Sequence, residues 1–269
     1  MKKKNKRILF LLAGILILCL IIAVLVKPRH GGDTAFVEIG FSRMYLLPCR
    51  GGYILIDTYY PHSYDKFLSG LKGLGIDVHD ISYILLTHHH DDHCGFAARL
   101  RRESGARLIL HRNAVDNLKI GKPDMNMHPL NACTYYSFRV FSLFKDSSDH
   151  SYPPVEITMK DHIVPGNDND VLRSLGVEGR IVYTPGHTDD SISVVMDDGR
   201  AFVGDAAMNL LNYCFCRRRP IWLADMGEVY TGWERLADSG ARVIYPAHGE
   251  PFGMEELKLT MAEYTSTEN

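Results

Sequence analysis

The sequence is poor in cysteine and tryptophan, and it has almost no excess of one charge. Its 269 residues include six cysteines and two tryptophans, and 30 basic side chains nearly balance 32 acidic ones, for a formal net charge of −2. Nucleic-acid-binding domains usually present a basic surface, so we expect no nucleic acid partner. With 46% apolar and 23% charged residues, the composition is that of an ordinary globular protein.

The cysteines do not predict a disulfide framework. Cys19 lies in an apolar run near the N-terminus, and the remaining five are Cys49, Cys94, Cys133, Cys214 and Cys216. An odd number does not allow all of them to pair within one chain. The close pair at 214 and 216 could be a redox or metal-binding spot, but two separate packed thiols are the favoured interpretation.

The N-terminal region is predicted to anchor the chain in a membrane. Basic residues at positions 2–7 precede Ile8–Val26, nineteen residues without charge, and Lys27-Pro28-Arg29 follows. As a helix this run would span about 28 Å, close to the hydrocarbon thickness of a bilayer. The basic residues in front favour a single-pass signal anchor that places the globular part outside the cytoplasm, at the cell membrane. The alternative is a cleaved signal peptide, but the run is longer than is usual for one, and no small-residue cleavage site follows it.

The chain therefore divides into three parts. Residues 1–27 are the cytoplasmic basic stub and transmembrane signal anchor, residues 28–34 are a short tether, and residues 35–265 are the globular domain. Residues 113–165 form an insertion within that domain.

Apolar runs predict alternating strands and helices in the globular domain. Strands are expected at Ala35–Ile39, Met44–Pro48, Tyr53–Ile56, Ile81–Leu86, Arg107–Leu110, Arg180–Tyr183, Ser191–Met196, Ala201–Val203 and Arg242–Tyr245. Helices are expected at Ser63–Leu74, Phe96–Glu103, Gly227–Ser239 and Met254–Tyr264. Two β-rich halves with helices between them indicate an α/β fold, in which a sandwich of sheets is covered by helices on both outer faces.

The insertion Asn113–Pro165 is the least regular part of the sequence. It holds Met125, Met127 and an aromatic cluster: Tyr135, Tyr136, Phe138, Phe141 and Phe144. Aromatic clusters are usually core, but this segment lacks strand alternation, so a lid or substrate wall is a second interpretation. Membrane-surface contact is a third, because Arg139 and Lys145 flank the aromatics.

A dense group of metal-binding residue types follows the strand predicted at Ile81–Leu86. The sequence Thr87-His88-His89-His90-Asp91-Asp92-His93 contains the pattern HxHxDH. Neutral imidazole and carboxylate are the ligands that Zn²⁺ and similar cations prefer. A short turn can direct His88 and His90 toward one ion, while Asp92 and His93 face a second. Histidine tags and solvated loops are also His-rich, but a tract between a strand and a helix fits neither.

Three more predicted strands end in a residue that can bind metal. His187 follows the strand that ends at Tyr183, Asp205 follows Ala201–Val203, and His248 follows the strand that ends at Tyr245. Glycine or proline lies beside each one, so the backbone can bend sharply there and approach a neighbour closely.

At these residues the chain resembles the metallo-β-lactamase-fold hydrolase superfamily. The resemblance covers Phe36 to Gly253 and includes the motifs THHHDDH, PGHT, VGD and AHG. It implies a four-layer αβ/βα sandwich with a dinuclear metal site at one edge of the sheets. Mapped by motif, the first metal would be bound by His88, His90 and His187, the second by Asp92, His93 and His248, and Asp205 would bridge both.

The resemblance leaves His89 and Asp91 at variable positions of the motif, where solvent or second-shell contacts are expected. Asp57, at the end of a predicted strand, is either a turn cap or a hydrogen-bond partner of a metal-binding imidazole. Cys94 directly follows a ligand and is expected to point into packing.

The implied activity is hydrolysis by a metal-bound hydroxide, with Asp92 and Asp205 as the catalytic carboxylates and a small-molecule substrate. Two divalent ions are expected; zinc is favoured by the extracytoplasmic placement, with iron and manganese as alternatives. True metallo-β-lactamases generally lack a carboxylate like Asp205, and homoserine-lactone hydrolases usually have tyrosine where this chain has Met208. We therefore expect an ester, lactone or related carbonyl substrate. The alternatives are a phosphodiesterase acting on cell-envelope or choline-phosphate substrates, then a β-lactamase-like activity, and, outside enzymes, a surface metal-binding or sensing module.

Overall fold

The computed structural model describes residues 34–142 and 150–267. The predicted anchor and almost all of the tether, together with Phe144 and Lys145 of the insertion, lie outside these ranges. None of the helices in the described residues is both long and apolar enough to cross a membrane.

The first sheet has six strands in the order β1-β2-β3-β4-β5-β7. Their bounds are β1 Ala35–Ile39, β2 Ser42–Cys49, β3 Gly52–Ile56, β4 Ile81–Leu85, β5 Arg107–His111 and β7 His162–Val164. The first three strands form an antiparallel meander, and the pairs β3·β4, β4·β5 and β5·β7 are parallel. Parallel neighbours place the carboxyl ends of several strands at the same edge.

The second sheet has five strands in the order β13-β12-β10-β9-β8. Their bounds are β8 Gly179–Tyr183, β9 Ile192–Met196, β10 Arg200–Gly204, β12 Val243–Pro246 and β13 Phe252–Gly253. The β10·β12 pair is parallel, and the other neighbours in this sheet are antiparallel. A separate two-stranded pair joins β6 (His128–Pro129) to β11 (Trp222–Leu223).

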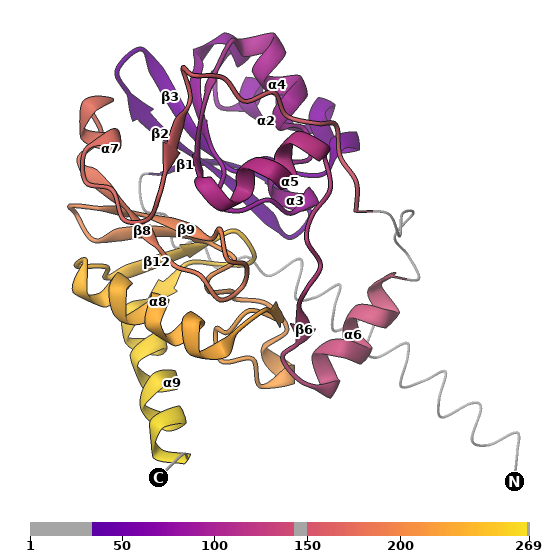
Figure 1. The fold of residues 1–269 in the computed structure, drawn as a ribbon, viewed down its shortest axis with the longest axis vertical. Helices are drawn as coiled ribbons and strands as arrows, with labels where there is room; N and C mark the ends of the chain where they lie inside the picture. Colours follow the sequence, from indigo (N-terminus) through magenta and orange to yellow (C-terminus); the bar gives the residue numbers. More distant parts are fainter. Residues whose placement is uncertain (1–33, 143–149, 268–269) are drawn as a thin grey trace, which may run out of the picture. The chain divides into compact units, whose positions relative to one another are not determined.

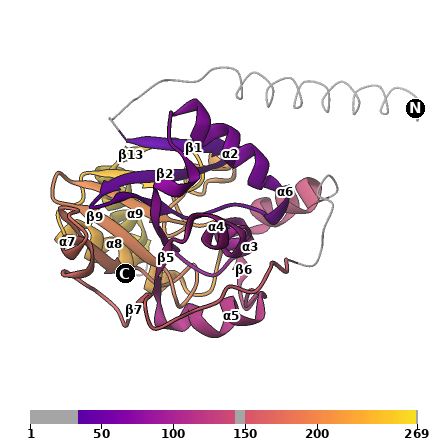
Figure 2. The ribbon, with the colours of Figure 1, turned by 90° about the horizontal axis from the view of Figure 1, so that it is seen from above.

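Three hydrophobic clusters separate four layers. Helices α2 (Tyr64–Gly73) and α4 (Ala97–Ser104) cover the outer face of the first sheet, and α8 (Met226–Asp238) and α9 (Met254–Thr267) cover the outer face of the second (Figures 1 and 2). The third cluster fills the space between the sheets. The predicted αβ/βα sandwich is confirmed.

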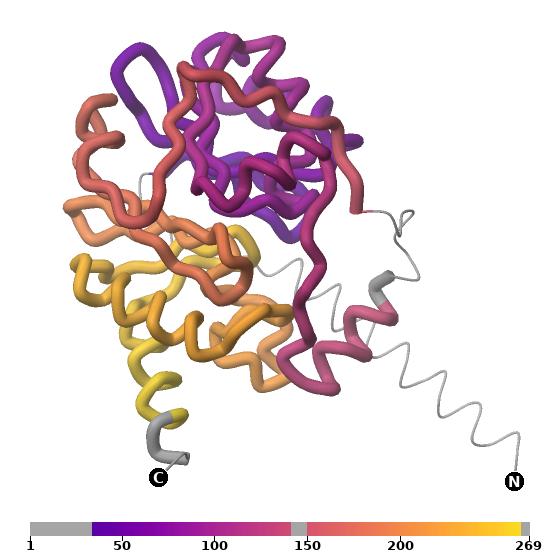
Figure 3. Tube along the Cα trace, viewed as in Figure 1, coloured from indigo at the N-terminus to yellow at the C-terminus, as the bar shows by residue number. Residues whose placement is uncertain are grey.

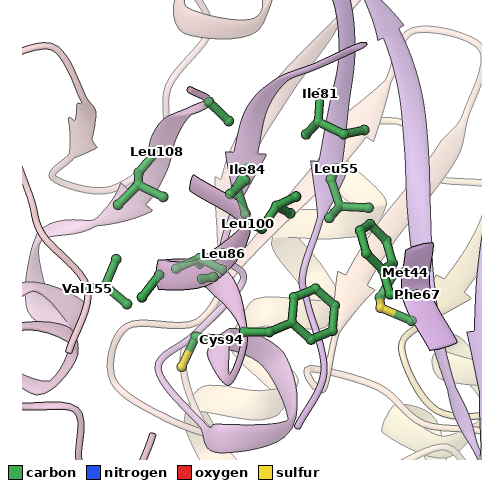
Figure 4. Packing of buried hydrophobic residues seen from close by; sticks show 14 of the residues in the cluster. Met44, Leu55, Phe67, Ile81, Ile84, Leu86, Cys94, Leu100, Leu108 and Val155 are labelled. Carbon is green, nitrogen blue, oxygen red and sulfur yellow. The ribbon is translucent and has the colours of Figure 1, made fainter. Parts of the chain in front are cut away.

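Side-chain alternation along β2 shows how one strand serves two layers. Met44 and Leu46 pack with the α2 and α4 side, whereas Tyr45 and Leu47 face the second sheet. Successive strand residues point to opposite faces, so a run that is apolar at every position becomes buried on both. Figure 4 shows the helix side of this arrangement, with Phe67 close to Met44.

Most predicted elements agree with the structure to within one or two residues, but the insertion is more regular than expected. It contains α5 (Val115–Ile120), α6 (Ala132–Ser142), β6 and β7. Although its sequence shows no strand alternation, it contributes β7 as an edge strand of the first sheet. At three residues, β7 is too short to show the alternation that identifies a strand in a sequence.

The remaining short helices of the described ranges are α3 (Asp91–Cys94), α7 (Val171–Ser174) and four 3₁₀ turns, η1 (Pro61–Ser63), η2 (Val78–Asp80), η3 (Arg112–Ala114) and η4 (Asn212–Cys214). The helix α3 carries half of the HxHxDH motif, directly beyond β4.

The interpretation of Cys214 as a separate packed thiol is also wrong. Cys214 forms a disulfide with Cys133, 81 residues earlier, at the start of α6. Nothing in the local sequence indicates this pairing, because only the fold brings α6 beside η4. Cys216 agrees with the prediction, since it is a buried free thiol.

The core beneath α8 offers a test of this packing. Trp233 is fully buried, and its Nε1 donates a hydrogen bond of 2.7 Å to the carbonyl of Ala206, next to Asp205. We expect Trp233→Ala to lower the free energy of unfolding by about 3–5 kcal/mol, because it opens a cavity and leaves that carbonyl unpaired. Denaturant unfolding measures this, and Leu259→Ala, at a 67% exposed site, is the control. Equal stability of the two variants would contradict the packing described.

Candidate metal centre

All seven predicted ligands lie in the loops and turns that follow strands. β4 leads to the turn of residues 87–93, β8 to His187, β10 to Asp205 and β12 to His248. The structure brings the seven together in three overlapping groups that could hold a metal ion: His88, His90 and His187; His88, His93 and Asp205; and Asp92, His93 and His248. Within each group the donor atoms lie within 4.8 Å of one another.

The first half-site is a triangle of imidazole nitrogens. His88 Nε2 lies 3.1 Å from His90 Nδ1, and His187 Nε2 lies 3.2 Å and 3.1 Å from these two atoms. Three nitrogens bound to one tetrahedral zinc ion at about 2.0 Å would be about 3.3 Å apart. The observed triangle is close to this size.

Hydrogen bonds on the far side of two rings fix which nitrogen carries the proton. Thr87 Oγ1 donates to Asp57 Oδ2 at 2.7 Å, so it has only lone pairs to offer His88 Nδ1, 3.1 Å away. His187 Nδ1 donates to the carbonyl of Trp222 at 2.8 Å. In their neutral forms both rings therefore carry a lone pair on Nε2, and these lone pairs face each other. A cation between them removes the conflict.

The second half-site combines two imidazoles with two carboxylates. His93 Nε2 lies 3.3 Å from Asp205 Oδ1 and 3.8 Å from Asp92 Oδ1. His248 Nε2 lies 3.3 Å from Asp205 Oδ1 and 3.5 Å from Asp92 Oδ2. The outer nitrogens are again occupied, since His93 Nδ1 donates to Asp57 Oδ2 at 2.9 Å and His248 Nδ1 lies 3.0 Å from Ser42 Oγ.

Asp205 lies between the two half-sites. One of its oxygens faces His93 and His248, and the other lies 3.5 Å from His187 Nε2. The side chains of His93 and Asp205 are 1% and 5% exposed, and His93 Nε2 and Asp205 Oδ1 have no hydrogen-bond partner among the described residues. Buried polar atoms without partners are rare and costly, and here they converge where a cation would satisfy them. The donor set fits two divalent ions.

The titration behaviour of the two half-sites differs. Burial, assisted by neighbouring imidazoles, holds the pKa of His88 well below its usual value and lowers the pKa of His90 to about 3. Burial also lowers the pKa of His187, although Asp205 opposes the shift. These three rings are therefore neutral, as metal ligation requires.

In the second half-site the carboxylates dominate. Burial alone would lower the pKa of His93 and His248, but Asp205 and Asp92 outweigh it and raise both pKa values. Burial would raise the pKa of Asp92 and Asp205, yet the facing imidazoles hold both below the ordinary range. The carboxylates are thus ionised, and without a metal they draw protons onto the rings.

Three other residues of the turn do not face the half-sites. His89 is buried and bonds to Asp190 Oδ1 at 2.8 Å, and Asp91 lies 3.3 Å from His150. The Cys94 thiol is buried and donates to the backbone carbonyls of His89 and His90, as expected for a packed residue. Asp57 accepts a hydrogen bond from the imidazole of His93, which is one of the two roles predicted for it.

Close backbone approach explains the glycines beside the ligands. A Cβ on Gly204 would lie 2.4 Å from Thr87 Oγ1, and one on Gly249 would lie 2.2 Å from the Asn209 carbonyl. Both residues also have positive φ angles, +52° and +97°. A side chain on Gly204 would push the strand end that carries Asp205 away from Thr87, and a side chain on Gly249 would push the segment that carries His248 away from Asn209.

Sequence reasoning did not identify several supporting groups. Ser42 and Thr87 orient His248 and His88, and the Trp222 carbonyl orients His187. Thr87 lies next to the motif and could have been considered, but a serine 206 residues away and a backbone carbonyl carry no local signal.

Comparison with known proteins agrees with this geometry. A family model described as the metallo-beta-lactamase superfamily matches residues 37–248. The chain is 27% identical over 234 residues to a beta-lactamase-like protein 2 homolog from Drosophila melanogaster, covering 85% of this chain and 67% of that protein. A hydroxyacylglutathione hydrolase from Rhodopseudomonas palustris is 29% identical over 128 residues, 47% of this chain and 34% of the relative.

The fungal relatives are longer than this chain. Lactamase-like protein adaB from Aspergillus niger is 26% identical over 236 residues, which cover 87% of this chain but 57% of that protein. Among solved structures, a metallo-beta-lactamase family protein from Thermus thermophilus has a TM-score of 0.60 at 24% identity, covering 87% of this chain and 79% of that one. A B3 metallo-beta-lactamase with an active-site glutamic acid has a TM-score of 0.58 at 21% identity, covering 89% and 90%. At these identities the structural likeness establishes the fold.

The contact between Asp57 and His93 predicts a measurable role in metal affinity. Asp57 has a φ of 61°, which asparagine tolerates, so Asp57→Asn should keep the backbone while weakening the bond to His93. We expect the affinity for one of two metal ions to fall by about 10–100-fold. Competition with a chromophoric chelator measures this, with Asp65→Asn, at an 85% exposed side chain, as control. Unchanged affinity for both ions would contradict the assigned contact.

Proposed function

Because the chain belongs to the metallo-beta-lactamase superfamily of hydrolases, we propose that it is a membrane-anchored hydrolase acting outside the cytoplasm, with two divalent metal ions, on an ester, lactone or related carbonyl substrate. The observation that carries the proposal is the convergence of five imidazoles and two carboxylates from four strand ends. A structural role alone would not require lone pairs to face one another in a buried site.

Each side chain has a proposed part. His88, His90 and His187 would hold one ion, Asp92, His93 and His248 would hold the other, and Asp205 would be shared by both. Two such ions would supply a hydroxide at neutral pH, by lowering the pKa of bound water, and would polarise a substrate carbonyl. Imidazole and carboxylate donors suit zinc, and they also accept iron or manganese.

The two carboxylates differ in exposure, which separates their roles. Asp205 is 5% exposed and faces both half-sites, so it would serve as a ligand shared by the two ions. Asp92 is 21% exposed, more than any imidazole of its half-site, and it is ionised. It is therefore placed to orient the attacking water and to accept its proton.

The substrate class rests on the relatives and on the ligand set. A relative named hydroxyacylglutathione hydrolase matches about half of this chain. The acyl group in that name supports attack at a carbonyl carbon rather than at phosphorus. The test below includes a phosphodiester and a β-lactam as the alternatives.

Two features support a location outside the cytoplasm. Ile8–Val26 is an uncharged run preceded by basic residues. Disulfides persist in oxidising compartments and are rare in the cytosol, and Cys133 and Cys214 form one.

The proposed reaction predicts a large effect of Asp205→Asn. Loss of the shared negative charge should lower kcat/KM by about 100-fold or more, because the ions lose their common ligand. Assays with p-nitrophenyl acetate, a homoserine lactone, bis-p-nitrophenyl phosphate and nitrocefin measure this, and Asp198→Asn, at a 52% exposed side chain, is the matched control.

We expect turnover of the ester or lactone, abolished by a chelator and restored by zinc. If the enzyme preferred the phosphodiester or nitrocefin, the proposed ester or lactone class would be wrong, and the preferred compound would indicate the correct class. No turnover of any compound by the metal-loaded wild type would favour a binding module.

The proposed location predicts that protease added to intact cells digests the globular domain. The full-length chain should remain in the membrane fraction after a high-salt wash, because an apolar segment rather than surface charge retains it. A cytoplasmic marker protein is the control for cell integrity. Complete protection from protease would overturn the location outside the cytoplasm, and release by salt would overturn the membrane anchor.

A further inference from the structure

A segment of the insertion passes beside the first half-site. Residues 121–131, here called the strap, connect α5 to α6, and Figure 3 shows the chain running through them between these helices. Within the strap, β6 pairs with β11, and the Leu130 amide donates to the Ile221 carbonyl at 3.0 Å. Most of the strap's side chains are exposed or half-buried.

Near its first end, at Asp124, the strap is bound to His89. The backbone amide of Asp124 donates to His89 Nε2 at 3.0 Å, and His89 Nδ1 lies 2.8 Å from Asp190 Oδ1. His89 and Asp190 are 1% and 0% exposed. A neutral ring with its proton on Nδ1 satisfies both contacts, donating to the carboxylate and accepting from the strap.

His89 is itself held rigidly between two ligands of the first half-site. Its carbonyl accepts hydrogen bonds from the Tyr152 hydroxyl at 2.8 Å and the Cys94 thiol at 3.2 Å. Its ring therefore projects from a fixed backbone, with His88 and His90 on either side in the sequence.

Near its second end the strap pairs with β11, and β11 contacts the first half-site. Trp222, the β11 partner of Pro129, offers its carbonyl to His187 Nδ1. Just beyond, Asn131 Nδ2 donates to the Cys214 carbonyl at 3.0 Å, and the disulfide of Cys133 follows. The stretch 124–129 is thus held at one end by the ring of His89, and at the other it pairs with the strand that contains Trp222, whose carbonyl accepts from His187.

We propose that His89 is a positioning residue that holds the strap as one wall of the substrate site, so that it sets KM rather than kcat. The inference rests on the proposed function, because it assigns the wall to the same metal site. Met125, 50% exposed, and the half-buried Met127 lie on the tethered stretch. Methionine side chains adapt to apolar ligands, so they suit contact with the acyl part of a substrate.

Two substitutions separate the contacts of His89. In His89→Asn, the amide nitrogen replaces Nδ1 and keeps the bond to Asp190, but nothing remains to accept from the Asp124 amide. In His89→Gln, the side-chain oxygen reaches the Nε2 position and keeps the strap contact, while the Asp190 contact is lost. Only the asparagine variant should release the strap.

The test combines hydrogen exchange with kinetics on the full-length, zinc-loaded chain. In His89→Asn we expect strap amides to exchange about tenfold faster than in the wild type, since one buried hydrogen bond is lost. KM for the p-nitrophenyl ester should rise about tenfold, with kcat within about threefold and unchanged metal content. In His89→Gln, strap exchange and KM should stay near the wild-type values.

If the strap amides of His89→Asn exchanged as slowly as in the wild type, His89 would not hold the strap. If kcat fell while KM stayed unchanged, the strap would not be a wall of the substrate site. If His89→Asn does not fold, Asp124→Pro removes the same donor from the strap side and should raise KM in the same way; an unchanged KM would then overturn the proposal. If the wild type hydrolyses no ester, the proposed function fails, while the exchange data still decide whether His89 holds the strap.

Discussion

His88 and His187 are held with the lone pairs of their Nε2 atoms facing each other across 3.2 Å. In a buried site this arrangement is stable only when a cation lies between the two nitrogens. The constraint comes from outside the site. Thr87 and the Trp222 carbonyl occupy the outer nitrogens, as Asp57 and Ser42 do for His93 and His248. These outer contacts decide which atoms point inward, and the carboxylates of Asp92 and Asp205 add the negative charge that a pair of cations requires.

The fold supplies this arrangement through the two sheets and the core between them. Tyr45, on the first sheet, donates to the Pro246 carbonyl at 2.8 Å, two residues before His248 on the second. The amide of Arg43 donates to the Ala247 carbonyl at 2.8 Å, so the sheets are also joined at the edge where the ligands lie. Each half-site combines ligands that follow β4 of the first sheet with ligands that follow strands of the second. Packing that fixes the distance between the sheets therefore fixes the spacing of the ligands within each half-site.

Local sequence signals predicted the longer strands and the residues that meet in the candidate metal centre, since apolar runs such as Ile192–Met196 and the HxHxDH turn are continuous in the chain. They were insufficient wherever a feature depends on long-range pairing. The three residues of β7 form a strand because β5 lies beside them, and Cys133 finds Cys214 because α6 packs near η4. The role of Asp190 likewise depends on the buried ring of His89, 101 residues away. Contacts made by a backbone carbonyl, such as that of Trp222, are independent of residue type and leave no trace in the sequence.

The central claim is that the seven side chains bind two divalent ions at once. Native mass spectrometry of the full-length chain, purified without chelator and titrated with zinc, counts bound ions directly. We expect zinc binding to saturate at two ions per chain. Replacement of His248 or Asp92 by alanine should remove one ion, and replacement of His187 should remove the other. Saturation at one ion or none, with all seven side chains intact, would contradict it.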